Sequence, residues 1–200
     1  MRRVIALLSL ALALPMAAWA DGIDLTNIRG TISVLSSGIT SKGSQLVSFN
    51  GIQAPPGKSL GSVSYGTGAL LTGSISGGGT FSDAGSYFNV VGKGNYGQPK
   101  GPIFTGAFVG PVTWQFDGQV KNVVTYELIG NLSGQDYTGH TVTGSTDQKF
   151  YSTQGQLSQG IGHVQLGTTH INSTPEPGTL GLLGTGLLGI AGAFRRKKSV

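Results

Sequence analysis

The chain has 200 residues, with 35 glycines, no cysteine and a formal net charge of +5. Without cysteine, it can hold neither a disulfide framework nor a thiolate-ligated metal. The surplus positive charge lies at the two ends, because residues 21–174 carry seven basic and seven acidic side chains. The basic balance therefore gives no indication of nucleic-acid binding, and we expect no nucleic-acid partner.

The first twenty residues have the pattern of a secretory signal peptide. Arg2 and Arg3 form a positive start, residues 4–14 are apolar, and Ala18 and Ala20 supply the small side chains of a signal peptidase site. We expect export through the Sec translocon and cleavage after Ala20. The apolar run is too short to favour a permanent anchor.

Residues 21–174 predict one all-β domain outside the cytoplasm. No window shows helical periodicity with caps, and short alternating apolar runs are separated by glycines instead. Eleven runs together predict about ten strands, and they lie at residues 31–35, 45–50, 62–65, 69–75, 86–91, 103–109, 112–116, 120–129, 137–143, 148–152 and 162–169. Such a set is typical of an antiparallel β-sandwich or a small barrel. A glycine-rich β-solenoid is the alternative, although no strong fixed-period repeat supports it.

The most clearly marked hairpin is centred on Asp117-Gly118, because this dipeptide is a strong two-residue turn signal. Trp114 and Phe116 share one face of the strand before it, and residues 120–129 return with an apolar face of their own. We expect the two aromatic side chains to pack across the pair and the hairpin to be the centre of folding.

Catalytic motifs are weak in this chain. Residues 57–61 fit the G-x-S-x-G pattern, but no helix follows, and matches by chance are expected in so much glycine and serine. The histidines His140, His163 and His170 lack the spacing of a zinc site, so we expect no metal and no cofactor.

Glycoside hydrolysis would require two carboxyl groups that flank the scissile bond. The acidic candidates are Asp83, Asp117, Glu127, Asp136 and Asp147. Glu127 alone lies inside a predicted strand, on the side away from its apolar neighbours, where a solvated position is the simpler interpretation. We predict no catalytic residue, and we keep a secreted glycan hydrolase that uses Glu127 as an alternative.

Tyrosines offer flat amphipathic faces that would suit sugar rings if they are exposed, whereas packing within the sheet is the competing interpretation. The candidates are Tyr65, Tyr87, Tyr96, Tyr137 and Tyr151.

Residues 175–200 have three parts in a fixed order. The prolines of Pro175-Glu176-Pro177-Gly178 disfavour helix, so this motif should be extended. Residues 179–194 are apolar and uncharged, and as a helix at 1.5 Å per residue they would span about 24 Å, enough for a short transmembrane helix. The basic cluster that follows predicts a cytoplasmic C-terminus, and it consists of Arg195, Arg196, Lys197 and Lys198.

This arrangement resembles the PEP-CTERM sorting signal of Gram-negative bacteria, a tail also classified as an ice-binding protein C-terminal domain. The resemblance implies recognition of residues 175–178 by an exosortase, a membrane-embedded cysteine protease-transpeptidase. It also implies transient anchoring in the inner membrane, followed by a place at the cell surface or outside the cell. It covers the tail alone, and residues 21–174 resemble no family.

The sequence therefore predicts an exported, exosortase-processed surface or matrix protein that is not an enzyme and is associated with exopolysaccharide and biofilm. Two alternatives stay open. One is the glycan hydrolase, and the other is a structural subunit that self-assembles through exposed sheet edges.

Overall fold

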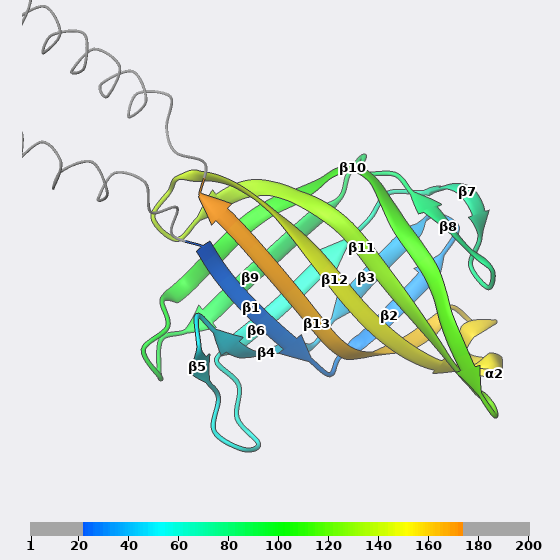
Figure 1. Cartoon of the computed structure of the whole chain (residues 1–200), viewed down its shortest axis with the longest axis horizontal. Helices are drawn as coiled ribbons and strands as arrows, with labels where there is room; N and C mark the ends of the chain where they lie inside the picture. The colour runs from blue at the N-terminus through cyan, green and yellow to red at the C-terminus, as the bar shows by residue number, and fades with distance from the viewer. Residues whose placement is uncertain (1–21, 174–200) are drawn as a thin grey trace, which may run out of the picture. The chain divides into compact units, whose positions relative to one another are not determined.

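A computed structural model describes residues 22–173, which are almost entirely β-structure (Figure 1). Within these residues no helix has the length and apolar character needed to cross a membrane. Several predicted features lie outside the described residues. They are the signal peptide with Ala18 and Ala20, the motif at 175–178, the apolar run at 179–194 and the basic cluster at 195–198.

Thirteen strands and one short helix occur in the described range. They are β1 (Gly22–Ile28), β2 (Thr31–Leu35), β3 (Gly38–Lys42), β4 (Ser44–Phe49), β5 (Ile52–Gln53), β6 (Gly61–Gly66), β7 (Leu70–Ser74), β8 (Gly78–Phe81), β9 (Tyr87–Lys93), β10 (Lys100–Val120), β11 (Val123–Asp136), β12 (Thr141–Thr153), α2 (Gln154–Leu157) and β13 (Ile161–Ser173).

Eight of the strands close into an antiparallel barrel. The ring runs β1, β13, β12, β11, β10, β9, β6 and β4, and β4 pairs with β1 again. The all-β prediction is confirmed in its barrel form. The sandwich and the solenoid are both wrong, because the sheet curves until its first and last strands pair and consecutive strands run antiparallel around one axis.

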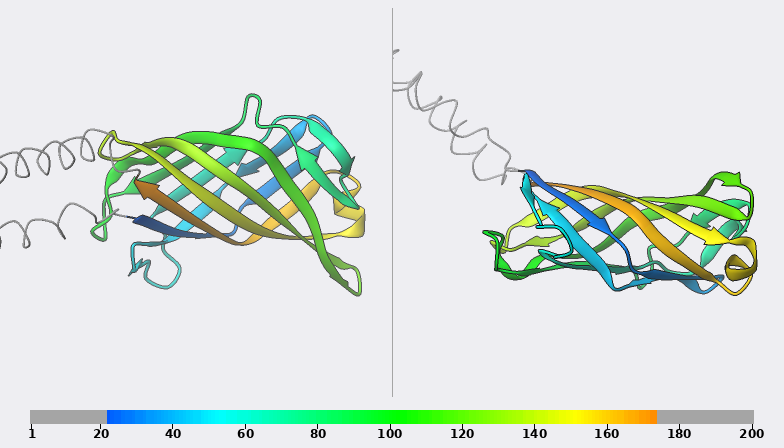
Figure 2. Two further views of the ribbon diagram at one scale, coloured as in Figure 1. Left: turned by 45° about the horizontal axis from the view of Figure 1, so that its top comes forward. Right: turned by 90° about the horizontal axis from the view of Figure 1, so that it is seen from below.

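Four short strands extend the ring strands and do not add a second layer, and they are β2, β3, β7 and β8. β1 and β2 both pair with β13, from Gly22 opposite Asn172 to Ser33 opposite Ile161, without a change of register. The two are separated by a kink at Arg29 and Gly30, whose φ angles of 62° and 88° are left-handed. In the same way β3 leads into β4, β6 into β7 and β8 into β9. The chain is thus an up-and-down meander, and Figure 2 shows its strands winding obliquely around the barrel.

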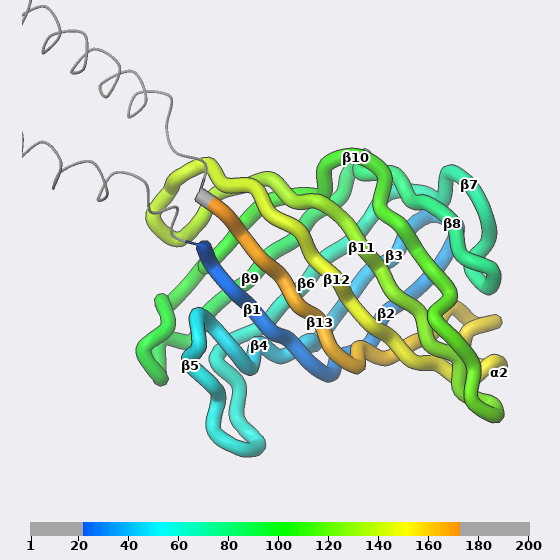
Figure 3. Tube along the Cα trace, in the orientation of Figure 1, coloured from blue at the N-terminus to red at the C-terminus, as the bar shows by residue number. Residues whose placement is uncertain are grey.

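The meander gives the barrel two ends that differ in what they carry. The terminal end holds Gly22, Ser173 and the connections at 50–60, 94–99 and 137–140. The mouth end holds the connections at 36–37, 75–77, 121–122 and 154–160, the last of which includes α2. The traces in Figures 1 and 3 place β1's start and β13's tip at one end, and α2, β7 and β8 at the other.

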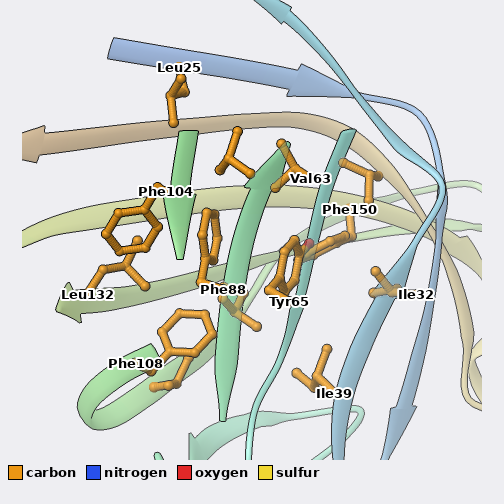
Figure 4. Packing of buried hydrophobic residues seen from close by; sticks show 14 of the residues in the cluster. Leu25, Ile32, Ile39, Val63, Tyr65, Phe88, Phe104, Phe108, Leu132 and Phe150 are labelled. Carbon is orange, nitrogen blue, oxygen red and sulfur yellow. The ribbon is translucent and has the colours of Figure 1, made fainter. Parts of the chain in front are cut away.

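Aromatic side chains fill the barrel interior (Figure 4). Phe88 stacks on Tyr65 with ring centroids 5.4 Å apart, and the edges of Phe104 and Phe108 meet its ring at 6.2 and 6.0 Å. Closer to the mouth end, Trp114 stacks on Tyr126 at 4.7 Å. Residues 22–173 therefore hold the whole closed ring together with its core, and they form a compact unit by themselves.

The predicted hairpin is present, but its predicted turn is wrong. β10 continues through Asp117-Gly118 to Val120, and the chain reverses at Lys121-Asn122, where Lys121 has a φ of 55°. A β-bulge between Phe116 and Gly118 absorbs Asp117 instead. The packing prediction is confirmed for Trp114, which is buried and faces Leu128, whereas Phe116 faces Tyr126 but stays 42 % exposed.

Two other local predictions differ from the structure. Residues 137–140 were predicted as part of a strand, yet they form a turn in which the Asp136 carboxylate accepts hydrogen bonds from the Thr138 and His140 amides. The separate strands predicted at residues 103–109 and 112–116 are one strand, because Gly110-Pro111 lies at an irregularity inside β10. The strands β1, β3, β5 and β8 lie outside the predicted set.

Candidate binding sites at the two ends of the barrel

A cavity of about 770 Å³ opens at the mouth end, and we call it the mouth cavity. Its walls come from β7 and the turn after it, from the β10–β11 hairpin and from α2. No charged side chain lines it. The apolar part of the lining consists of Leu70, Ile75, Phe116, Val124, Tyr126 and Leu157.

Hydrogen bonds from two core aromatics hold one wall of this cavity. Trp114 Nε1 donates to the Ile75 carbonyl at 2.8 Å, and the Tyr126 hydroxyl donates to the Ser76 carbonyl at 2.9 Å. Burial raises the pKa of Tyr126, which keeps its hydroxyl protonated and able to donate. The turn at 75–77 is thereby fixed over the Trp114–Tyr126 stack.

At the terminal end, the connection at 94–99 is held by a buried amide. Gln98 is only 4 % exposed, and its Nε2 donates to the Leu60 carbonyl at 2.7 Å and to Asn95 Oδ1 at 2.9 Å. Its Oε1 accepts from the Tyr96 amide at 3.0 Å. Tyr96 is 37 % exposed, so the loop presents this ring to solvent from a fixed backbone.

Two exposed lysines flank this loop, and a third lies in a segment that contacts it. Lys93 and Lys100 face each other directly in the β9–β10 pair. Lys93 Nζ donates to Ser59 Oγ at 2.6 Å, and Lys58 directly precedes Ser59 in the chain. Both ion pairs found within residues 22–173 involve other side chains. We call Lys58, Lys93, Lys100 and Tyr96 the basic patch.

The five candidate acids do not all gather in one place, and two of them lie apart, Asp83 in a loop and Asp136 at the end of β11. Asp83 accepts from the Gly110 amide at 2.8 Å, and Asp136 holds its own turn. In Asp136 burial opposes ionisation, but hydrogen bonds from Thr138 and His140 outweigh it and lower the pKa.

Glu127 and Asp147 do lie close together, on the outer wall of neighbouring strands. Glu127 Oε1 is 3.3 Å from Lys149 Nζ, as expected for a side chain that alternates away from the core. Burial raises the pKa of Asp147, and its hydrogen bond to Glu127 and that group's charge raise it further. The charge of Asp117 also acts on Asp147, while Lys149 opposes the shift.

The three histidines lie at separate places. His140 contacts the Thr138 hydroxyl in the turn at 137–140, His163 stacks on Tyr151, and His170 pairs with Asp24. Within residues 22–173, no three histidine, aspartate or glutamate side chains lie close enough together to hold a metal ion.

The tyrosines do not form one sugar-binding face. Tyr65 is fully buried, and burial raises its pKa. Tyr96 and Tyr137 belong to the terminal end, whereas Tyr151 lies on the outer wall. Ser59 of the G-x-S-x-G pattern is buried beside Lys93, and strand β6 follows it. The basic patch depends on a contact between residues 58–60 and 93–98 that no short motif indicates.

Comparison with known proteins identifies the tail of the chain. A family model described as the PEP-CTERM protein-sorting motif matches residues 173–197. This motif is the recognition signal for exosortase, and it indicates a secreted surface protein whose C-terminal membrane anchor an exosortase processes. No curated protein and no solved structure matches the chain. The barrel itself is recognised by no family model.

Proposed function

We propose that the barrel is a non-enzymatic surface or matrix module that holds an acidic exopolysaccharide of the biofilm through its basic patch. The proposal also includes export by the Sec translocon, cleavage by signal peptidase after Ala20, and transient anchoring with a cytoplasmic C-terminus. Exosortase then releases the barrel to the cell surface or the extracellular matrix.

The observation that carries this proposal is the pairing of Lys93 with Lys100 at the two ends of the loop that carries Tyr96. Like charges directly opposite each other in a sheet repel, so a bound anion would relieve the repulsion. A uronate polymer offers carboxylates to the lysines and the apolar face of a sugar ring to the tyrosine. The buried Gln98 keeps the loop in place before any ligand arrives, which lowers the entropic cost of binding.

The test measures binding of residues 22–173 to alginate, a polyuronate, and to neutral dextran. Replacing both Lys93 and Lys100 by alanine should weaken alginate binding about tenfold, because each exposed ion pair contributes up to about 1 kcal/mol. Binding should also weaken as salt is added, since exposed charges are screened.

Lys42→Ala is the matched control, because Lys42 is also exposed but lies on β3. Equal losses in the control and the double variant would contradict the proposal, as would equal retention on dextran. Tyr96→Ala should weaken binding without changing its salt dependence.

A glycan hydrolase is the second candidate, favoured by the raised pKa of Asp147 beside Glu127. Two neighbouring carboxyl groups, one of them with a raised pKa, are a pairing that acid–base chemistry uses. In the same binding assay, shortening of the polymer that Glu127→Gln abolishes would support the hydrolase. The self-assembling subunit has less support, because the eight ring strands are paired on both sides.

A further inference from the structure

We propose that the mouth cavity is a second binding site, separate from the basic patch, and that it takes a neutral, mainly apolar small molecule such as a single hydrocarbon chain. The proposal does not depend on the polymer bound at the other end. It rests on the chemistry, the size and the rigidity of the cavity.

Apolar side chains come from every wall of the cavity, and four of the five polar side chains in the lining already take part in hydrogen bonds. Gln119 Nε2 donates to the Lys121 carbonyl at 2.8 Å, and Gln154 Nε2 donates to Gln119 Oε1 at 3.3 Å. Ser158 Oγ donates to the Gly155 carbonyl, and Ser74 Oγ accepts from the Gly77 amide. A sugar or an ion would lose its hydration for few new hydrogen bonds, whereas an apolar ligand needs none.

The size of the cavity suits one small molecule. Pockets for such ligands typically enclose about 300–1,000 Å³, and the mouth cavity has about 770 Å³. The interior of an eight-stranded barrel is either filled by side chains or holds one small ligand. Here the aromatic core fills the barrel as far as the Trp114–Tyr126 stack, and the cavity lies beyond it.

One aromatic ring in the lining remains open to solvent. Phe116 is 42 % exposed, and its ring meets Tyr126 edge-on with centroids 5.5 Å apart. A ligand that covers this ring removes apolar surface from water, which favours binding. Because Trp114 and Tyr126 already fix the turn at 75–77, the site needs little ordering when the ligand enters.

The chain carries its own reporter for this site. It has two tryptophans, and Trp19 precedes the predicted cleavage site, so Trp114 is the single tryptophan of residues 22–173. The probes are N-phenylnaphthylamine, which is neutral, and its sulfonated analogue anilinonaphthalene sulfonate. We expect saturable binding of the neutral probe with energy transfer from Trp114. Binding of the sulfonate should be weaker by about tenfold or more, because its charge would be desolvated.

Phe116→Glu tests the location of the site. A carboxylate in the lining should weaken binding of the neutral probe by about tenfold or more. Val120→Glu is the matched control, since Val120 belongs to the same hairpin, is 75 % exposed and does not line the cavity. Circular dichroism of both variants checks that the barrel is intact.

Three results would overturn the proposal. One is that the neutral probe does not saturate or shows no transfer from Trp114. Another is that both probes bind the unmodified barrel equally well. That result can be interpreted without any variant. The third is that a neutral oligosaccharide displaces the probe, which would make the mouth cavity a sugar site.

Discussion

Gly167 on β13 lies against two buried amides inside the barrel. Asn27 Nδ2 donates to Gln148 Oε1 at 3.0 Å, and Gln148 Nε2 donates back to Asn27 Oδ1 at 3.2 Å. Both side chains are fully buried, and further bonds to Ser44 and Thr146 complete the network. A buried polar network stabilises a fold only when all of its members have hydrogen-bond partners. The absence of a side chain at Gly167 leaves the space that these hydrogen bonds need.

Gly167→Ala should destabilise the barrel by about 2–3 kcal/mol, because the added carbon would overlap the network and leave buried amide groups unpaired. A Cβ at this position would lie 2.1 Å from Gln148 Oε1 and 2.4 Å from Asn27 Oδ1. Urea unfolding of residues 22–173 measures the change.

The control is Gly155→Ala in α2, where a Cβ meets no atom within 4 Å. This substitution should be neutral or slightly stabilising, because alanine favours helix over glycine. If Gly167→Ala unfolds at the same urea concentration as the control, the network does not restrict this position.

The pairing of β1 with β13 is the seam that closes the ring, and it carries an ion pair between elements from opposite ends of the described chain. Asp24 lies directly opposite His170 in this register. The hydrogen bond to Asp24 raises the pKa of His170, and the charge of Asp24 adds to it, against the opposing effect of burial. The seam is therefore more stable when the imidazole is protonated.

The sign of the pH dependence follows from this shift. The folded pKa of His170 is higher than the unfolded one, so the contribution is complete below the unfolded value of about 6.5. It is lost as the pH rises through the raised folded value. Because both side chains are largely exposed, its size should be a few tenths of a kcal/mol up to about 1 kcal/mol.

A double-mutant cycle with Asp24→Asn and His170→Gln measures the contribution from thermal unfolding. The coupling between the two positions should be present at about pH 5.5 and absent at about pH 8.5, on either side of the titration of His170. A coupling that stays constant over this range would show that the charge of His170 plays no part in the seam.

At the scale of the whole barrel, the two proposed binding sites lie at opposite ends. Ser173, from which the sorting tail continues, lies at the same end as the basic patch, and the mouth cavity opens at the other end. A polymer held at the terminal end would therefore leave the mouth cavity accessible. The two proposed sites can be tested independently, because no residue belongs to both.

Replacing Pro175, Glu176 and Pro177 by alanines should block exosortase processing, since these residues lie near the start of the matched segment, residues 173–197. Mass spectrometry of membrane and surface fractions would then recover the chain with residues 179–200 still attached. The control is Pro55→Ala with Pro56→Ala, which changes exposed prolines in the barrel. If the motif variant is cut and released like the control, residues 175–177 are not the processing signal.

The sequence by itself determined those features that depend on residues close together in the chain. The tail is recognised as a linear motif, and the all-β class follows from alternation along each strand, which also placed Trp114 in the core and Glu127 outside. The turn at Asp117-Gly118 was wrong because a bulge, set by pairing with β11, moved the reversal to Lys121-Asn122.

Only the tertiary structure decided which distant residues meet. Asn27 and Gln148, which form a hydrogen bond, are 121 positions apart in the sequence. Lys93 and Ser59, which also form a hydrogen bond, are 34 positions apart. The sheet forms a barrel and not a sandwich because β1 pairs with β13. The mouth cavity forms because β7 and the turn after it, the β10–β11 hairpin and α2 converge at one end. Strand alternation sets which side of a strand is buried, but the partner strand and its register are set by the closure of the whole sheet.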